Sequence, residues 1–173
     1  MRLAILPAAA AVLATAVYAA AANSGPSDPE IAHIAYTAGA IDVAAARLAL
    51  DRSGNQAVRA FAETMIRDHE AVNAKALALV RKLNVTPQDN PVSVSLGDEA
   101  TASMKRLESL DGPAFDRAYA RHEADYHKTV NGALRATLIP AADNQELKAL
   151  LQSGLALFGE HQRHAESLTA ELE

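Results

Sequence analysis

Residues 56–84, QAVRAFAETMIRDHEAVNAKALALVRKLN, contain the hydrophobic pattern that decides the fold class. Positions separated alternately by four and three residues recur along the whole stretch: Val58, Ala62, Met65, His69, Val72, Ala76, Leu79 and Leu83. This spacing places side chains on one face of an α-helix. All but one of these residues are apolar, so the pattern predicts a long helix that packs against other helices, with a histidine on its buried face.

Three other stretches repeat this helical spacing. They cover residues 27–52, 111–140 and 143–172. Asp28 is the expected N-cap of the first, and Asp143 with Glu146 forms the expected capping box of the last. The first stretch ends at Ser53-Gly54, directly before the helix predicted at 56–84. So short a junction makes these two helices antiparallel neighbours.

The connection between the second and third long helices differs from the others. Residues 85–112 contain Pro87 and Pro91 and only a shorter amphipathic stretch, which predicts a crossover with one short helix. Two short-looped helix pairs joined by a long crossover are the topology of ferritin-like proteins. We therefore expect an all-α fold, a ferritin-like antiparallel four-helix bundle.

The first 22 residues have the layout of a secretory signal peptide. Arg2 precedes an apolar stretch at 3–17, and small residues form a cleavage site directly before Asn23. An uncleaved membrane anchor is the alternative, but this stretch is shorter than the roughly 20 residues that a membrane span needs. We expect a signal peptide at 1–22, a linker at 23–28 and a bundle domain at 29–173, located in the periplasm and without a membrane span in the mature chain.

The composition limits the classes of partner. The chain has 21 acidic and 16 basic residues and no cysteine. Its negative net charge argues against nucleic acid as a partner. An exported chain without cysteine depends on packing, or on a bound ligand, rather than on disulfides for its stability. The oligomeric state stays open, and a homo-oligomer is one of the alternatives.

Histidines occupy two positions that the helical spacing assigns to the interior. His69 lies on the buried face of the helix predicted at 56–84, and His161 lies on that of the last helix. A buried imidazole has a donor and an acceptor, and each costs about 1–3 kcal/mol when it is unpaired. Two explanations stay open: hydrogen bonds to a tyrosine hydroxyl or a carboxylate, or binding to a metal ion.

The other two long helices add ligands for the second explanation. Glu123 and His127 lie one turn apart on the third, and Asp42 lies at the edge of the buried face of the first. One carboxylate and three imidazoles would then meet: Asp42, His69, His127 and His161. Such nitrogen and oxygen ligands suit a divalent transition metal, with zinc, iron and copper favoured by histidine. The affinity should fall below about pH 6.5, where an ordinary histidine becomes protonated.

Further residues are candidates for hydrogen-bond partners of these ligands or for alternate ligands. Ligating histidines usually donate their second N–H to an oxygen, for which the candidates are Asp68, Glu123 and Glu160. Counting from the predicted helix ends offsets His127 from His161 by roughly 9 Å along the helix axis, so His122 and His164 are alternates. The Glu-x-x-His signature of di-iron proteins is absent, because no glutamate stands three residues before any of the three candidate histidines.

Four segments resemble a widespread family of exported bacterial ferritin-like proteins. They are residues 39–43 (GAIDV), 61–69 (FAETMIRDH), 115–119 (FDRAY) followed by His127, and Glu160-His161. That family is catalogued as a domain of unknown function, and its members are often labelled putative outer membrane protein. The resemblance covers about residues 29–172 and implies a ferritin-like four-helix bundle outside the cytoplasm. It also implies site positions at Asp42, where the family usually has Glu, and at His69, His127 and His161.

Three functions stay open. The first is a metal-binding protein for buffering or stress protection. The second is a metal-free envelope protein that acts through its surface, with its interior histidines only hydrogen-bonded. The third is a helical protein with b-type haem, because the chain lacks the attachment motif of c-type haem. No motif predicts a catalytic activity.

Overall fold

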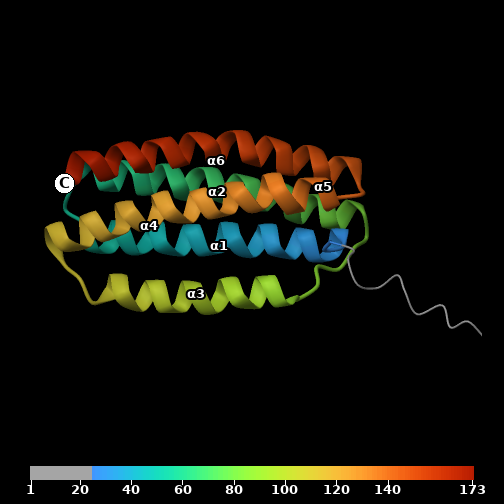
Figure 1. The fold of residues 1–173 in the computed structure, drawn as a ribbon, viewed down its shortest axis with the longest axis horizontal. Coiled ribbons are helices and arrows are strands. Elements are labelled where there is room, and N and C mark those ends of the chain that lie inside the picture. Colours follow the sequence, from blue (N-terminus) through green and yellow to red (C-terminus); the bar gives the residue numbers. More distant parts are fainter. Residues whose placement is uncertain (1–24) are drawn as a thin grey trace, which may run out of the picture.

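The computed structural model describes residues 25–173, which are almost entirely helical and contain no strand. Four long helices lie side by side: α1 (Asp28–Arg52), α2 (Gln56–Lys82), α4 (Gly112–Ala133) and α6 (Gln145–Leu172) (Figure 1). A fifth helix, α3 (Pro91–Glu108), lies along the outside and contacts α1 and α4. The prediction of an all-α fold is thus confirmed. The expected signal peptide at 1–22 lies outside the described residues.

The direction of the chain alternates between neighbouring long helices. Figure 1 shows α2 returning along α1 and α6 returning along α4, and the contacts between elements are most numerous within these two pairs. Between the pairs, the chain passes back along the molecule through α3, so α2 and α4 run in the same direction (Figure 1). The helix predicted within residues 85–112 is therefore present, and at 18 residues it is longer than expected.

The helix caps differ from the predictions by one residue at two places. Ser27, not Asp28, is the N-cap of α1. The Glu30 carboxylate accepts hydrogen bonds from the backbone N–H (2.8 Å) and the hydroxyl (2.6 Å) of Ser27. Asn144, not Asp143, caps α6 through its side chain. Asp28 instead accepts bonds from the backbone N–H groups of Asp143 (3.0 Å) and Asn144 (2.9 Å). Asp28, which the local capping rules favour as an N-cap, therefore bonds to a distant segment of the chain instead.

The third long helix ends close to Pro140, as predicted. After α4 it passes through a π-helical turn, η1 (Leu134–Leu138), into a last turn, α5 (Ile139–Ala141). Pro140 has no N–H, so the residues before it can leave the α-helical bonding pattern at little cost.

Two hydrophobic clusters fill the interior. One surrounds Phe61, Phe115 and Tyr119, and the other surrounds Leu134 and Leu151. Each long helix contributes to both clusters, and at the boundary between them each carries a buried polar side chain: Asp42, His69, His127 and His161. The fold therefore places the residues predicted on separate helices at a single level of the interior.

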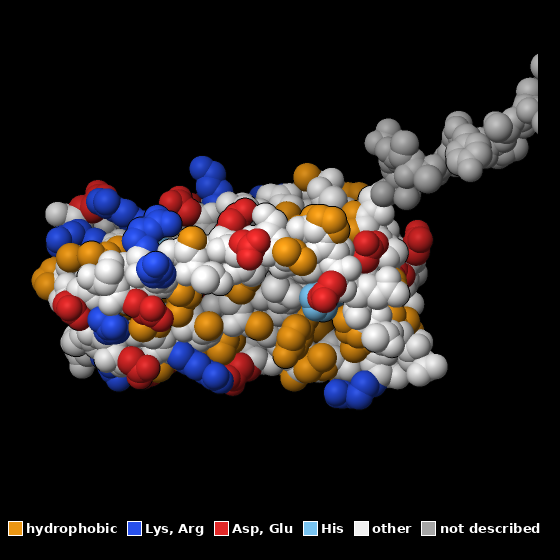
Figure 2. All heavy atoms as spheres, turned by 90° about the horizontal axis from the view of Figure 1, so that it is seen from below, with side chains coloured by type: hydrophobic (Ala, Val, Ile, Leu, Met, Phe, Trp, Pro, Cys, Tyr) orange, Lys and Arg blue, Asp and Glu red, His pale blue; other side chains and the backbone are white. Residues whose placement is uncertain are grey.

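The surface on the side of α3 mixes charge and apolar area. Acidic and basic side chains alternate over it, and hydrophobic side chains are exposed around the start of α3, where Val92 and Val94 are 51% and 56% exposed (Figure 2). Among the described residues, no helix combines the length and the apolar character that crossing a membrane requires.

Candidate metal centre

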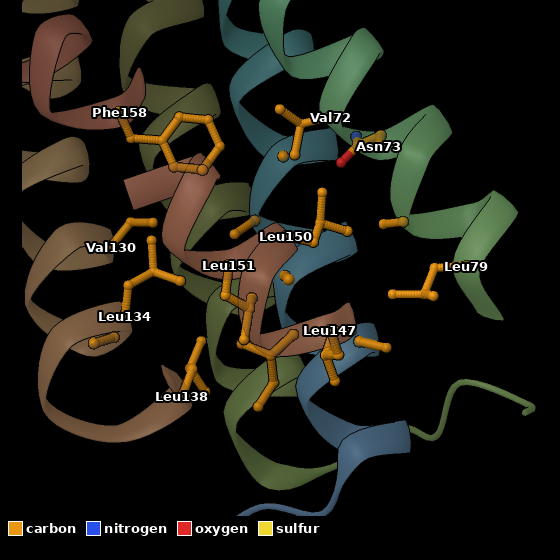
Figure 3. A pocket seen from close by; sticks show the side chains of 18 of the residues that line it. Val72, Asn73, Leu79, Val130, Leu134, Leu138, Leu147, Leu150, Leu151 and Phe158 are labelled. Carbon is orange, nitrogen blue, oxygen red and sulfur yellow. The ribbon is translucent and has the colours of Figure 1, made fainter. Parts of the chain in front are cut away.

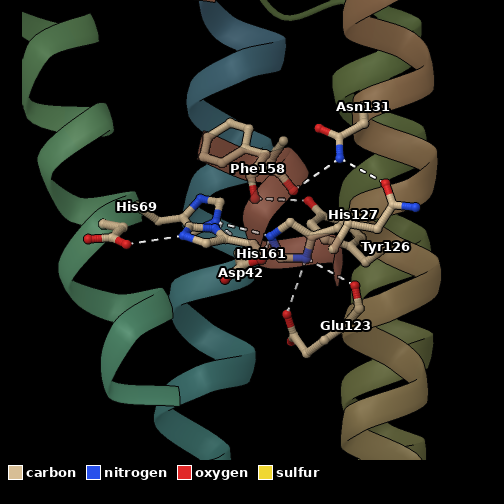
Figure 4. A network of polar contacts seen from close by, with 11 residues as sticks. Asp42, His69, Glu123, Tyr126, His127, Asn131, Phe158 and His161 are labelled. Atoms are coloured by element: carbon tan, nitrogen blue, oxygen red, sulfur yellow. Dashed lines mark hydrogen bonds and ion pairs between the residues drawn. The ribbon is translucent and has the colours of Figure 1, made fainter. Parts of the chain in front are cut away.

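Four potential metal ligands meet in the interior, one from each long helix (Figure 4). Asp42 is fully buried, and His69, His127 and His161 are between 1% and 3% exposed. The Nε2 atoms of His69 and His127 lie 3.4 Å apart. The Asp42 Oδ2 atom lies 3.5 Å from the first and 3.4 Å from the second. These three atoms form a nearly equilateral triangle.

The backbone fixes the protonation of His127. Its Nδ1 lies 3.0 Å from the carbonyl oxygen of Glu123, one turn earlier on α4. A carbonyl can only accept, so Nδ1 carries the proton and Nε2 carries the free lone pair. That lone pair faces His69 and Asp42.

Asp68 plays the same part for His161. Its Oδ2 lies 3.1 Å from His161 Nε2, and its carboxylate is held from the other side by Arg67 (2.8 and 3.1 Å). These contacts assign the proton to Nε2 of His161. Its Nδ1 is buried and has no hydrogen-bond partner among residues 25–173. A ligand nitrogen of His161 lies within 4.8 Å of those of His69 and His127.

An aromatic ring holds His69 in place. The Phe158 ring stacks on the imidazole with ring centroids 4.6 Å apart and planes 3° from parallel. His69 Nδ1 is buried without a partner in the described part of the chain. His69 therefore faces the cluster through Nε2, which contacts His127 Nε2 (3.4 Å), and the stacked Phe158 ring fixes the plane of the imidazole.

A second carboxyl group, that of Glu123, lies behind His127. Its Oε2 is 3.6 Å from His127 Nδ1, and one of its carboxyl oxygens lies within 4.8 Å of one of Asp42. Burial raises the pKa of Asp42 to about 7, and the neighbouring Glu123 carboxyl group acts in the opposite direction. Burial also raises the pKa of Glu123 well above its ordinary value, and the nearby Asp42 charge raises it further. Two adjacent buried carboxyl groups thus retain protons that exposed ones would lose.

Burial keeps the imidazoles neutral. It lowers the pKa of His69 to about 2, an effect that the neighbouring His127 and His161 reinforce. It lowers the pKa of His127 to about 4, although the hydrogen bond to the Glu123 carbonyl acts in the opposite direction. The pKa of His161 is lowered as well, chiefly by burial. Neutral imidazole is the form that coordinates metal ions.

The spacing of the ligand atoms fits a small divalent ion. Ligands at about 2.0–2.1 Å from a tetrahedral ion lie about 3.3–3.4 Å from one another. The three separations among Asp42, His69 and His127, 3.4 to 3.5 Å, match this value. His161 would supply a fourth ligand.

The other predicted candidates lie in different surroundings. Asp68 and Glu123 contact the cluster, whereas Glu160 is exposed and forms an ion pair with Arg163. His122 stacks on Tyr126, and His164 is exposed beside Phe61. Neither alternate histidine belongs to the buried groups of potential ligands, which are His69, His127 and His161, and Asp42, Glu123 and His127.

The axial offset expected between His127 and His161 is absent, since their ring centroids lie 5.4 Å apart. The expected offset is counted from Leu138, the last residue on the predicted apolar face, whereas the helix continues to Ala141. Three more residues at 1.5 Å each remove about half of it. The rest of the expected offset is removed by the way α4 and α6 pack against each other, which counting residues does not take into account.

Two supporting residues had not been singled out from the sequence. The Tyr126 hydroxyl donates to the carbonyl of Ala38 on α1 (2.9 Å). The buried Asn131 donates from Nδ2 to the carbonyl of Phe158 (3.1 Å), which ties α4 to α6 beside the cluster. Asn131 follows Glu123 and His127 at steps of four, so the same helix face would have indicated it.

Comparison with known proteins gives a family but no activity. A family model described as a domain of unknown function, DUF4142, matches residues 13–168. No curated protein and no solved structure matches the chain. Since the match extends over most of the sequence, including all four residues of the cluster, the chain belongs to the DUF4142 family.

Proposed function

We propose that this chain is an exported, ferritin-like four-helix-bundle protein that binds one divalent transition metal ion, zinc, iron or copper, in its interior. The ligands are Asp42, His69, His127 and His161. The observation that carries the proposal is the convergence of neutral, buried imidazoles on a carboxylate without a hydrogen-bond donor. Such a protein would serve metal buffering or stress protection.

The unpaired atoms favour a metal over a purely hydrogen-bonded interior. Among the described residues, both carboxylate oxygens of Asp42 and Glu123 are buried without a partner, as is Nδ1 of His161. Unpaired buried polar groups cost about 1–3 kcal/mol each, and native proteins contain few of them. A bound divalent cation supplies the positive charge that the buried carboxylates lack. Asp68 and the Glu123 carbonyl orient two of the imidazoles toward it.

A thermal melt tests the proposal. The melting temperature of the metal-free protein should rise when Zn²⁺ is added, because a ligand that binds only the folded state stabilises it by mass action. At a free concentration one hundred times Kd, the gain is about 2.7 kcal/mol. Fe²⁺ and Cu²⁺ should be compared at equal concentration. If none of the three ions changes the melting temperature, the interior histidines are structural.

The metal affinity should depend on pH through Asp42 rather than through histidine. Asp42 has a pKa of about 7 and must lose its proton to bind, whereas His69 and His127 stay neutral down to about pH 4. Below pH 7 the affinity should therefore fall about tenfold per pH unit, or about 1.4 kcal/mol. The metal affinity should therefore begin to fall at a higher pH than the 6.5 expected from an ordinary histidine.

The Asp42→Asn variant distinguishes a pH dependence that arises from Asp42 from one that arises from the histidines. The variant should bind Zn²⁺ more weakly at pH 8, but its affinity should change little between pH 8 and pH 6, as measured by competition titration. A decline in the variant as steep as that of the wild type would assign the pH dependence to the histidines.

Export can be tested separately from metal binding. The intact mass of the protein recovered from the periplasm should correspond to a chain that begins at Asn23, as the signal-peptide pattern predicts. A mass that includes residues 1–22, recovered in the membrane fraction, would support the uncleaved anchor instead.

A further inference from the structure

An apolar cavity of about 270 Å³ adjoins the histidine cluster. It lies within the hydrophobic cluster around Leu134 and Leu151, and leucines of η1 and α6, together with Val130 of α4, surround it (Figure 3). His69, His127 and Phe158 form part of its wall. The cavity and the candidate metal centre therefore share two imidazoles.

Small residues keep this space open. Ala35, Ala38 and Gly39 of α1 line it, together with Ala76 of α2 and Gly154 of α6. At the same level of a helical interior, leucine or isoleucine would normally fill the gap between facing helices. A Cβ on Gly39 would lie 2.4 Å from Asn73 Oδ1, so a larger residue at this position would displace the Asn73 side chain.

The lining defines the chemistry of an occupant. Most of the surrounding side chains are aliphatic, and the one carboxylate among the described ones, that of Asp28, already accepts two backbone hydrogen bonds. An ion would lose its hydration here without gaining a counter-charge from the wall. The neutral polar side chains that line the space are those of His69, Asn73, Tyr126, His127, Thr129 and Asn144.

We propose that the cavity binds a small, neutral, mainly apolar molecule with one polar group directed at His69, whose Nδ1 is buried without a partner among the described residues. An apolar cavity of about 150 Å³ stays dry and accepts benzene, so this one accommodates a molecule roughly twice that size. The occupant would thus be a two-ring aromatic or an aliphatic chain of similar volume. This site does not depend on the metal, and it gives the protein a second ligand class beside the metal ion.

The test uses 1-aminonaphthalene, a neutral two-ring probe whose emission shifts to the blue in apolar surroundings. Titrated into the metal-free protein, it should show saturable binding with this shift. Ala35→Leu, which adds volume inside the cavity, should weaken binding by about tenfold or more. Ala44→Leu makes the same change on an exposed position of α1 and should leave binding unchanged. Ala76→Leu provides a second filling variant from α2, in case the first fails to fold.

The outcomes are distinguishable from those of the metal proposal. Ala35→Leu should still show the Zn²⁺-induced rise in melting temperature, because it does not touch the four ligands. Absence of saturable binding to the wild type would overturn the cavity proposal, even if the metal response is present. Equal binding to the wild type and to both filling variants would place the probe elsewhere on the protein and would also overturn it.

Discussion

His69→Ala should abolish the Zn²⁺-induced rise in melting temperature. The replacement removes one corner of the triangle formed with Asp42 and His127, whose three sides measure 3.4 to 3.5 Å. A stabilisation of about 2.7 kcal/mol corresponds to about 5–10 °C in a chain of this size, which is the shift that should disappear. His161→Ala should act in the same way from α6.

The control for this experiment is His164→Ala. His164 lies on the same helix as His161 but is exposed, and its ring contacts Phe61 rather than the cluster. This variant should retain the full metal response, even if its own melting temperature changes slightly. Equal loss of the response in the His161 and His164 variants would assign metal binding to the surface of α6.

Glu123→Leu should stabilise the metal-free protein by about 1–3 kcal/mol. The Glu123 side chain is fully buried, and neither of its carboxylate oxygens has a hydrogen-bond partner among the described residues. Leucine has a similar length and removes that desolvation cost. The bond from His127 Nδ1 survives, because its acceptor is the backbone carbonyl of residue 123. Urea denaturation with a chelator present measures the free energy of unfolding.

The matched control is Glu160→Leu, at an exposed glutamate of α6 that pairs with Arg163. Exposed substitutions of this kind change stability little. If Glu123→Leu instead lowers the free energy of unfolding by more than that control does, Glu123 has a stabilising partner in the folded protein. A stabilised variant would show that the carboxyl group is retained at a cost in stability, as is common at functional sites.

Much of the helical architecture was predictable because it depends on spacing along the chain. The alternation of three and four residues located α1, α2, α4 and α6, and it placed His69 and His161 in the interior. Helix ends were less predictable. Asp28 satisfies the local rule for an N-cap, but it instead binds backbone N–H groups at the start of α6. Such a competing contact joins residues more than one hundred positions apart and leaves no local pattern.

The residues of the candidate site could be predicted from the sequence, but their common height along the helices and their surroundings could not. Asp42, His69, His127 and His161 could be selected because each interrupts or borders an apolar face. Their meeting at one level depends on how α4 packs against α6, which spacing along the chain alone does not determine. The cavity could not be predicted from the sequence either, because small residues such as Ala35 and Gly154 are equally common where two helices pack closely.

Elemental analysis of the protein purified from its native compartment tests the central claim most directly. Wild type should carry about one equivalent of zinc, iron or copper per chain, and the His69→Ala and His161→Ala variants, purified in parallel, should carry almost none. Retention of metal by His164→Ala would confirm that the interior cluster holds the ion. Wild type with no more metal than the two ligand variants would contradict the account.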